Sequence, residues 1–341
     1  MKRDLYWDSL KFFLIFLVVF GHCIRLYKPD GGINIVFFNY IYTFHMPLFI
    51  FVSGFFSHIK DRYKYKLGIL RILETYVVFQ LIEAVPPVLL DCDITLRSIV
   101  SILVFPRSIL WYLLSLVLWR LIIYYMPEND INKYPIRIML LCIFISLFSG
   151  FIPIGEQFSL QRTMTFLPFF FIGYYAKDIE IKNIINRIPF VFAFALMISS
   201  LLIYFFLFNK PISFILTGKC TYWLIIGFSP FQLCLARVLF LFAASIMGVM
   251  ICRIVPTRPL FSHWGSITLF IYIYHPYAIK VMYYAIKNGY LPQAEWLLIV
   301  MSVIIIMGII LLSHIRFLNI LLNPVSYILK KRNRSTIKYD I

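Results

Sequence analysis

Apolar runs about as long as a bilayer is thick recur along almost the whole chain, and they restrict its fold more than any other feature. Hydrophobic residues make up 62% of the 341 residues and charged residues only 14%, whereas a soluble domain is near half apolar and a quarter charged. Water could not solvate this composition, so it indicates a protein whose solvent is lipid. The sequence therefore predicts an all-α, polytopic transmembrane helical bundle.

About ten segments have the length and apolarity of a spanning helix, which needs roughly 20 residues. One of them is short, and residues 223–228 could be interfacial or re-entrant, so nine or eleven spans are also compatible with the sequence. The ten predicted spans are residues 7–27, 33–56, 67–90, 109–126, 136–153, 164–176, 188–208, 230–251, 267–286 and 296–318.

The distribution of basic residues predicts the orientation of these spans. The net charge is +17, from 32 Lys and Arg against 15 Asp and Glu. With a cytoplasmic N-terminus, the inner connections hold more than twice as many basic residues as the outer ones, as the positive-inside rule requires. We therefore expect both termini inside, one membrane domain over residues 1–329 and a basic cytoplasmic tail over residues 330–341. This asymmetry explains the charge without a nucleic-acid partner.

The first predicted span carries a cation and an imidazole on one helix face. Lys11 and His22 are 11 residues apart, almost three helical turns, or roughly 16 Å along the axis. Asp8 lies one turn before Lys11, where the two side chains can pair. Ionisable groups inside a membrane usually mark a functional site. Alternatively, the Asp8–Lys11 pair only snorkels at the interface, and a backbone carbonyl satisfies His22.

This layout suits a long anionic acyl donor such as coenzyme A, with phosphates at one end and a thioester at the other. Lys11 could hold the phosphate or pantetheine groups, while His22 meets the thioester or the acceptor hydroxyl. Imidazole is the usual general base near neutral pH. We expect His22 and Asp8 to be catalytic residues, and Lys11 and Arg71 to bind the donor.

Polar residues in later spans are expected to line the same cavity. In the second span, His45 precedes a proline-containing turn, and Ser53-Gly54 permits close packing or a bend. Each candidate has a simpler explanation: a hydrogen bond to a neighbouring helix for His45, an aromatic belt for Trp111, and an ion pair with Glu156 for Arg162. For Arg71, the preference of basic residues for the cytoplasmic side of a membrane is explanation enough. The expected cavity-lining residues are His45, Ser53, Trp111, Arg162 and His275.

Motifs of several other protein classes are missing from the sequence. The histidines lack the spacing of a metal site, so no metal and no tightly bound cofactor are expected. There is no P-loop, no GxSxG elbow and no GxGxxG. Their absence argues against an ATP-driven pump and a nicotinamide enzyme.

Several blocks of the sequence resemble the acyltransferase 3 family of membrane O-acyltransferases, particularly its fucose 4-O-acetylase-like branch. Lys11, ten residues and then His22 match the family's pattern of a basic residue, ten residues and a histidine. The second-span block that starts at Phe44-His45 and the position of Arg71 also resemble the family. The remaining similar blocks are Trp111-Tyr112-Leu113, Arg162 with Phe166 to Tyr174, and Tyr274-His275.

The resemblance implies ten helices, a cytoplasmic acyl-CoA donor and a carbohydrate acceptor such as a capsule, an O-antigen or another lipid-linked glycan. It implies catalysis by His22 and donor binding by Lys11, although many members have arginine at this position, and lysine cannot make the bidentate phosphate contact of arginine. We therefore expect a multi-pass O-acetyltransferase of the bacterial cytoplasmic membrane that uses acetyl-CoA to modify a polysaccharide. The alternatives are a transporter or flippase of a lipid-linked glycan, and a non-catalytic scaffold.

Overall fold

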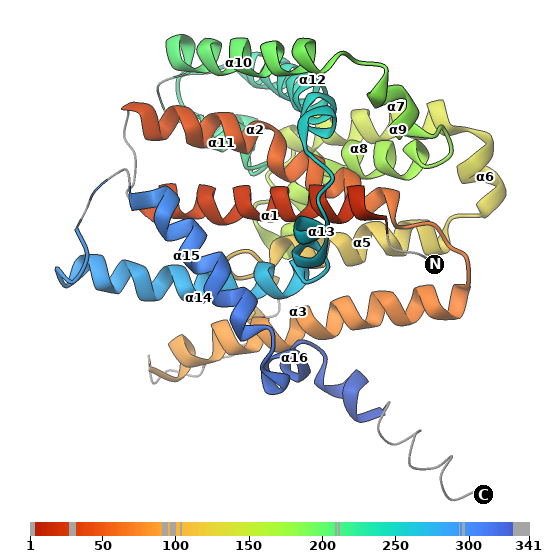
Figure 1. Ribbon diagram of the computed structural model, residues 1–341. Coiled ribbons are helices and arrows are strands. Elements are labelled where there is room, and N and C mark those ends of the chain that lie inside the picture. The colour runs from red at the N-terminus through yellow and green to blue at the C-terminus, as the bar shows by residue number, and fades with distance from the viewer. Residues whose placement is uncertain are drawn as a thin grey trace, which may run out of the picture.

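The computed structural model describes residues 4–26, 32–90, 95, 100–102, 104–208, 210, 212–292, 294 and 297–329, and every regular element in these ranges is helical (Figure 1). The predicted all-α class is confirmed. The predicted tail, residues 330–341, lies outside the described residues, as do Tyr27 and Trp296 at the ends of two predicted spans. The helices are α1 (Leu5–Leu26), α2 (Gly32–Phe55), α3 (Arg62–Leu90), α5 (Trp111–Tyr125), α6 (Glu128–Lys133), α7 (Pro135–Phe148), α8 (Leu160–Ala176), α9 (Ile181–Asn186), α10 (Phe190–Leu207), α11 (Ser213–Leu216), α12 (Pro230–Ile254), α13 (Pro259–Gly265), α14 (Thr268–Lys287), α15 (Leu297–Leu312) and α16 (Arg316–Leu322), with 3₁₀ turns η1 (Ser149–Phe151), η2 (Gln157–Ser159) and η3 (Tyr222–Leu224).

Each predicted span coincides with a helix or a helix pair, but only some of these helices have the properties of a span by themselves. Among the described residues, four helices, namely α1, α2, α10 and α12, are long and apolar enough to cross a membrane. Helices α15 and α16 would form a fifth span if they are counted together across their 95° bend. The fold is thus that of a multi-helix protein with several potential spans, while the count of about ten and the inside location of both termini stay predictions.

Large apolar side chains cover the outer faces of several helices. On α10, Phe206 and Leu207 are 72% and 71% exposed, and Phe144 on α7 and Leu311 on α15 are exposed in the same way. A soluble monomer rarely exposes apolar patches of this extent. These faces instead suit contact with lipid acyl chains, since no free energy is gained by hiding an apolar side chain from hydrocarbon.

Helix α1 lies at the centre of the bundle, and this position brings its polar residues inside. It packs against α2, α13, α14 and α15 (Figure 1). Leu10, Leu14, Ile15 and Val19 have no exposed surface. Because several faces of α1 contact other helices rather than lipid, polar side chains along it can face protein.

Helices α2 and α8 approach each other at two glycines. A Cβ atom at Gly54 would lie 1.9 Å from the carbonyl oxygen of Phe170, and one at Gly173 would lie 1.9 Å from that of Phe51. Small residues are the usual means by which membrane helices bring their backbones together. Of the two alternatives given for Ser53-Gly54, close packing or a bend, the structure shows close packing at Gly54, and it brings together the helices that carry His45 and Arg162.

A buried arginine joins three segments on the side of the bundle formed by α7 and α12. Arg237 on α12 has no exposed surface. Its guanidinium donates to the Ser146 carbonyl at 2.9 Å, to the Ser149 hydroxyl at 3.0 Å and to the Cys220 carbonyl at 2.7 Å. It also lies 4.8 Å from the centre of the Tyr222 ring. Arg237 thus ties the connection between α11 and η3 to α7 and α12.

Arg237→Met is expected to destabilise the fold, because methionine fills a similar volume but donates no hydrogen bond. Hydrogen bonds to charged groups contribute about 1.5–3 kcal/mol each, and part of this is offset by the lower cost of burying an uncharged side chain. A net loss of roughly 1–3 kcal/mol should lower the thermal unfolding midpoint of the detergent-solubilised protein. Arg187→Met, at an exposed position, is the matched control. Equal midpoints for the two variants would contradict this role of Arg237.

Candidate active site

A cavity of about 60 Å³ lies beside His22 and is lined by side chains from α1, α2, α5, α8, α11 and α14. His22 comes from α1, His45 from α2, Trp111 from α5, Arg162 from α8 and Tyr272 from α14. We call this space the histidine pocket. His22 therefore faces the protein interior and shares a pocket with His45, as expected if the two act in one cavity.

The ring of His22 lies against a second imidazole. The ring centroids of His22 and His275 are 5.2 Å apart. His275 is fully buried, and its Nδ1 lies 3.2 Å from the Ile271 carbonyl oxygen. A carbonyl only accepts, so Nδ1 carries the proton and Nε2 is left as an acceptor. That Nε2 has no hydrogen-bond partner in the described part of the chain.

His45 has the same tautomer for the same reason. Its Nδ1 lies 2.7 Å from the Ile41 carbonyl, one turn earlier on α2. The Tyr42 ring packs edge-on against His45, with the centroids 4.6 Å apart. Gly21 makes room for this ring, because a Cβ there would lie 2.9 Å from the Tyr42 Cε2 atom. The bond of His45 is thus made to its own helix, and not to a neighbouring helix.

His22 differs from the other two histidines because no backbone carbonyl holds its ring. No hydrogen bond within residues 4–26, or to any other described segment, involves its nitrogens. The alternative of a histidine satisfied by a backbone carbonyl describes His45 and His275, not His22. Its ring nitrogens are therefore available for proton transfer with a bound molecule.

Arg162 places a cation at the edge of the histidine pocket. Its guanidinium lies 4.6 Å from the centre of the Trp111 ring, within the range of a cation–π contact. The pairing with Glu156 that the sequence left open is not formed, since the Glu156 carboxylate pairs with Lys219 instead. Arg162 has no carboxylate within ion-pair distance in the described ranges.

A second, more polar cavity of about 120 Å³ adjoins the first, and we call it the rim pocket. The two pockets share Ser108, Trp111 and Arg162 as lining residues. The rim pocket also contacts Glu156 and Lys219, whose side chains are 60% and 35% exposed. The rim pocket therefore lies between an exposed surface and the side chains that border the histidine pocket.

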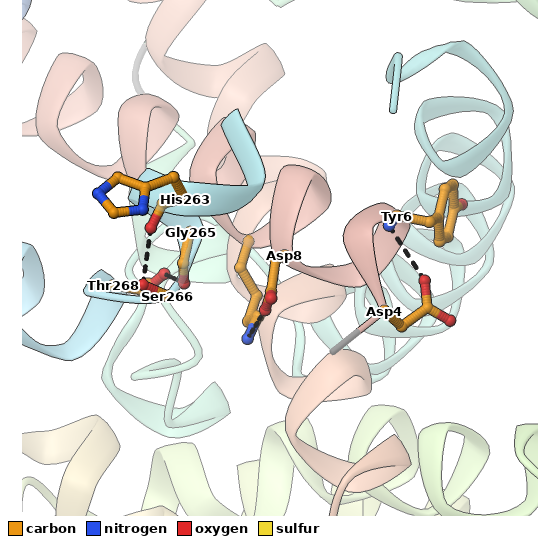
Figure 2. Close-up of polar contacts among 8 residues, drawn as sticks. Asp4, Tyr6, Asp8, His263, Gly265, Ser266 and Thr268 are labelled. Atoms are coloured by element: carbon orange, nitrogen blue, oxygen red, sulfur yellow. Dashed lines mark hydrogen bonds and ion pairs between the residues drawn. The ribbon is translucent and has the colours of Figure 1, made fainter. Parts of the chain in front are cut away.

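Asp8 and Lys11 lie toward the other end of α1. Lys11 Nζ is 2.5 Å from Asp8 Oδ1, and the Asp8 ion pair is drawn in Figure 2. Asp8 is buried, whereas the Lys11 side chain is 27% exposed. Gly265 on α13 lies against this turn, since a Cβ there would be 1.8 Å from the Asp8 carbonyl oxygen. The predicted pair is confirmed, and α1 separates it from His22 by roughly 16 Å.

The structure does not bring the remaining predicted residues together with His22. Arg71 is exposed on α3, and no contact among the described residues joins it to Lys11. Ser53 lies 2.6 Å from the Tyr112 hydroxyl oxygen and donates to the Phe49 carbonyl, so it links α2 with α5 rather than lining the pocket. Asp8 is separated from His22 along the same helix. The functional roles of all three stay predictions.

Sequence reasoning missed several residues that line the two pockets. Tyr272 precedes His275 by three residues, and Tyr42 precedes His45 by three, so helical spacing could have found both. Ser108, Thr217 and Gln161 also line these pockets. Ser108 and Thr217 lie in connections, and Gln161 lies at the start of α8. No periodic signal points to these three.

Comparison with known proteins gives two matches. A family model described as an acyltransferase domain, that of acyltransferase 3, matches residues 4–315. A segment of 57 residues is 42% identical to nodulation protein NolL of Sinorhizobium fredii. This segment covers 16% of the chain and 16% of that relative, so the likeness to the curated protein is confined to a short stretch. No solved structure matches the chain.

Proposed function

Because the chain belongs to the acyltransferase 3 family and is therefore an acyltransferase, we propose that it moves an acetyl group from acetyl-CoA to a hydroxyl of a cell-surface or lipid-linked carbohydrate. The apolar helices support a membrane location, and we place the enzyme in the bacterial cytoplasmic membrane. The observation that carries the proposal is His22, an imidazole without a backbone partner among the described residues, in a pocket that adjoins the more exposed rim pocket.

His22 would act as the general base in this reaction. Its free nitrogen takes the proton of the sugar hydroxyl as the oxygen attacks the thioester carbonyl. The tetrahedral intermediate then collapses, the carbon–sulfur bond breaks, and the departing thiolate receives the proton from the imidazolium. The product is an O-acetyl ester and free coenzyme A, so atoms and charge balance.

His275 would position His22 for this task. Its unpartnered Nε2 is an acceptor, and it belongs to the ring that lies beside His22. An N–H of His22 that points at this acceptor would leave the other nitrogen of His22 free for the substrate. Such a base, oriented by a further group, is the usual arrangement around a catalytic proton transfer.

Lys11 would hold the donor at the opposite end of α1. Its amine is partly exposed, while the buried Asp8 carboxylate holds it in place. A distance of roughly 16 Å to His22 suits an extended pantetheine arm between phosphates and thioester. Arg71 would add a second cation on this side. Lysine offers the phosphates a point charge rather than the fork of an arginine.

Mass spectrometry of surface glycans tests the proposal. Cells that express the wild type should carry O-acetyl groups that are absent from cells expressing His22→Ala. A transporter or flippase would instead change the amount of surface glycan and leave its acetylation unchanged. The proposal is wrong if glycans from wild-type and His22→Ala cells carry equal acetylation at equal protein levels.

Lys11→Met is expected to raise KM for acetyl-CoA about tenfold or more and to leave kcat within a few-fold. The reason is that a contact made equally in ground state and transition state affects binding only. The measurement is acetyl transfer in membranes at varied acetyl-CoA concentrations. Lys64→Met removes an exposed lysine from the start of α3 and serves as the control. A fall in kcat at unchanged KM would refute a donor-binding role for Lys11.

A further inference from the structure

Two polar side chains, Gln161 and Arg162, line the rim pocket from adjacent positions on α8. Gln161 is 2% exposed. Its amide nitrogen donates to the carbonyls of Ser149 at 3.0 Å and Cys220 at 3.1 Å. Because both carbonyls require a donor, the orientation of the amide is set, and Oε1 is the atom left over. Among the described residues, this buried oxygen receives no hydrogen bond.

The neighbouring Arg162 is a hydrogen-bond donor, whereas Gln161 Oε1 is an acceptor. It contacts the Trp111 ring but pairs with no carboxylate of the described chain, because Glu156 is engaged by Lys219. Because Glu156 and Lys219 neutralise each other, Arg162 is the charged side chain without an opposite partner among the described residues that line the rim pocket. A partly desolvated guanidinium binds a carboxylate or phosphate through paired, charge-assisted hydrogen bonds.

We propose that the rim pocket binds an acidic group of the acceptor glycan, which is a carboxylate or phosphate on the acylated sugar or on the adjoining one. This inference rests on the proposed function and names the chemical class of its acceptor. The acid pairs with Arg162, beside the buried Gln161 amide. With a neutral sugar, the guanidinium would have no anion among the described residues.

The position of the rim pocket supports this assignment. Arg162 and Trp111 belong to both pockets, so a sugar bound beside Arg162 can extend a hydroxyl toward His22. The Lys11 end of α1, where the donor would bind, lies roughly 16 Å from His22 along the helix. A positively charged cleft also raises the local concentration of an anionic substrate. The acceptor acid thus has a site separate from that of the donor phosphates.

Calorimetric titration of the purified protein in nanodiscs tests the proposal without turnover. The probes are digalacturonate, galactose 6-phosphate and neutral galactobiose. At least one acidic sugar should bind at least about tenfold more tightly than galactobiose, as one charge-assisted hydrogen bond allows. Preference for digalacturonate assigns the acid as a carboxylate, and preference for galactose 6-phosphate assigns it as a phosphate. Failure of both to exceed galactobiose overturns the proposal.

Two variants that change the charge of the rim pocket in opposite directions sharpen this test. Arg162→Gln should remove the preference for the acidic sugar, and Glu156→Gln, which frees Lys219, should increase it several-fold. Lys64→Gln is the matched control, because it removes a lysine from an exposed ion pair at the start of α3. Retention of the preference in Arg162→Gln would overturn the proposal. Should that variant not fold, the sign of the Glu156→Gln effect decides.

The test of the acidic-acceptor inference can be separated from the test of the proposed function. His22→Gln protein should retain the preference for the acidic sugar although it transfers acetyl groups about 10²- to 10⁴-fold more slowly than the wild type. If wild-type protein acetylates glycans but binds acidic and neutral sugars equally, only the acidic-acceptor inference fails. If acidic sugars bind selectively and glycan acetylation is independent of the protein, only the proposed function fails.

Discussion

His22→Gln lowers the rate of acetyl transfer by about 10²- to 10⁴-fold, the range that a general base contributes. Glutamine has a similar size and can hydrogen-bond the acceptor hydroxyl, but it cannot take its proton. Because His22 is held by no backbone carbonyl of the described residues, we expect the variant to fold and to be present at wild-type levels. The measurement is the initial rate of radiolabelled acetyl transfer from acetyl-CoA to glycan in isolated membranes.

A second histidine substitution controls for this experiment. His263, labelled in Figure 2, is exposed on α13 and does not line the histidine pocket, so His263→Gln should transfer acetyl groups at the wild-type rate. His275→Gln should give an intermediate loss with the KM for acetyl-CoA unchanged, because it disturbs the orientation of the base but not the donor site. A His22→Gln rate within threefold of wild type, about 0.7 kcal/mol, would exclude His22 as the base.

Gly173→Ala is expected to have the largest effect on folding. The added methyl group would lie 1.9 Å from the Phe51 carbonyl oxygen, which belongs to the backbone of α2 and cannot rotate away. Separating α2 from α8 to relieve this clash should cost at least about 2–3 kcal/mol. The intrinsic helix propensity of alanine favours the substitution by only about 1 kcal/mol. We expect a lower unfolding midpoint and loss of acetyl transfer.

Gly308 on α15 offers the matched control for that substitution. A Cβ at Gly308 would have no atom within 4 Å, so Gly308→Ala adds the same methyl group to a helix without a clash. Its unfolding midpoint should equal or exceed that of the wild type. Identical midpoints for Gly173→Ala and Gly308→Ala, measured by thermal unfolding in detergent, would show that the α2–α8 contact tolerates separation.

The helical positions of the candidate site could be predicted from the sequence because helical geometry is local. The spacing of Asp8 and Lys11 predicts an ion pair, and the structure contains it. The spacing of Lys11 and His22 predicts that both side chains lie on one face of the same helix, roughly 16 Å apart along its axis. Gly54 and Pro47 stand out in an apolar run, and Gly54 lies at the contact between α2 and α8.

The sequence could not predict which side chains from distant segments contact each other. Glu156 is close to Arg162 in sequence but pairs with Lys219, which arrives from the connection after α11. The sequence predicted that Ser53 lines a cavity, yet its hydroxyl forms a hydrogen bond with the Tyr112 hydroxyl. No sequence pattern pointed to Gln161, because a glutamine near the end of an apolar segment is common. Its role depends on the two hydrogen bonds that its amide nitrogen donates, which only the structure shows.

By itself, the sequence determined a helical membrane protein with a basic residue and a histidine on its first helix, because apolar length and helical spacing are properties of short segments. Only the tertiary structure decided that His22 meets His275, that Arg162 is left without a carboxylate among the described residues, and that Arg162 borders both pockets. These facts depend on side chains from helices far apart in sequence, and their contacts follow from how the helices pack.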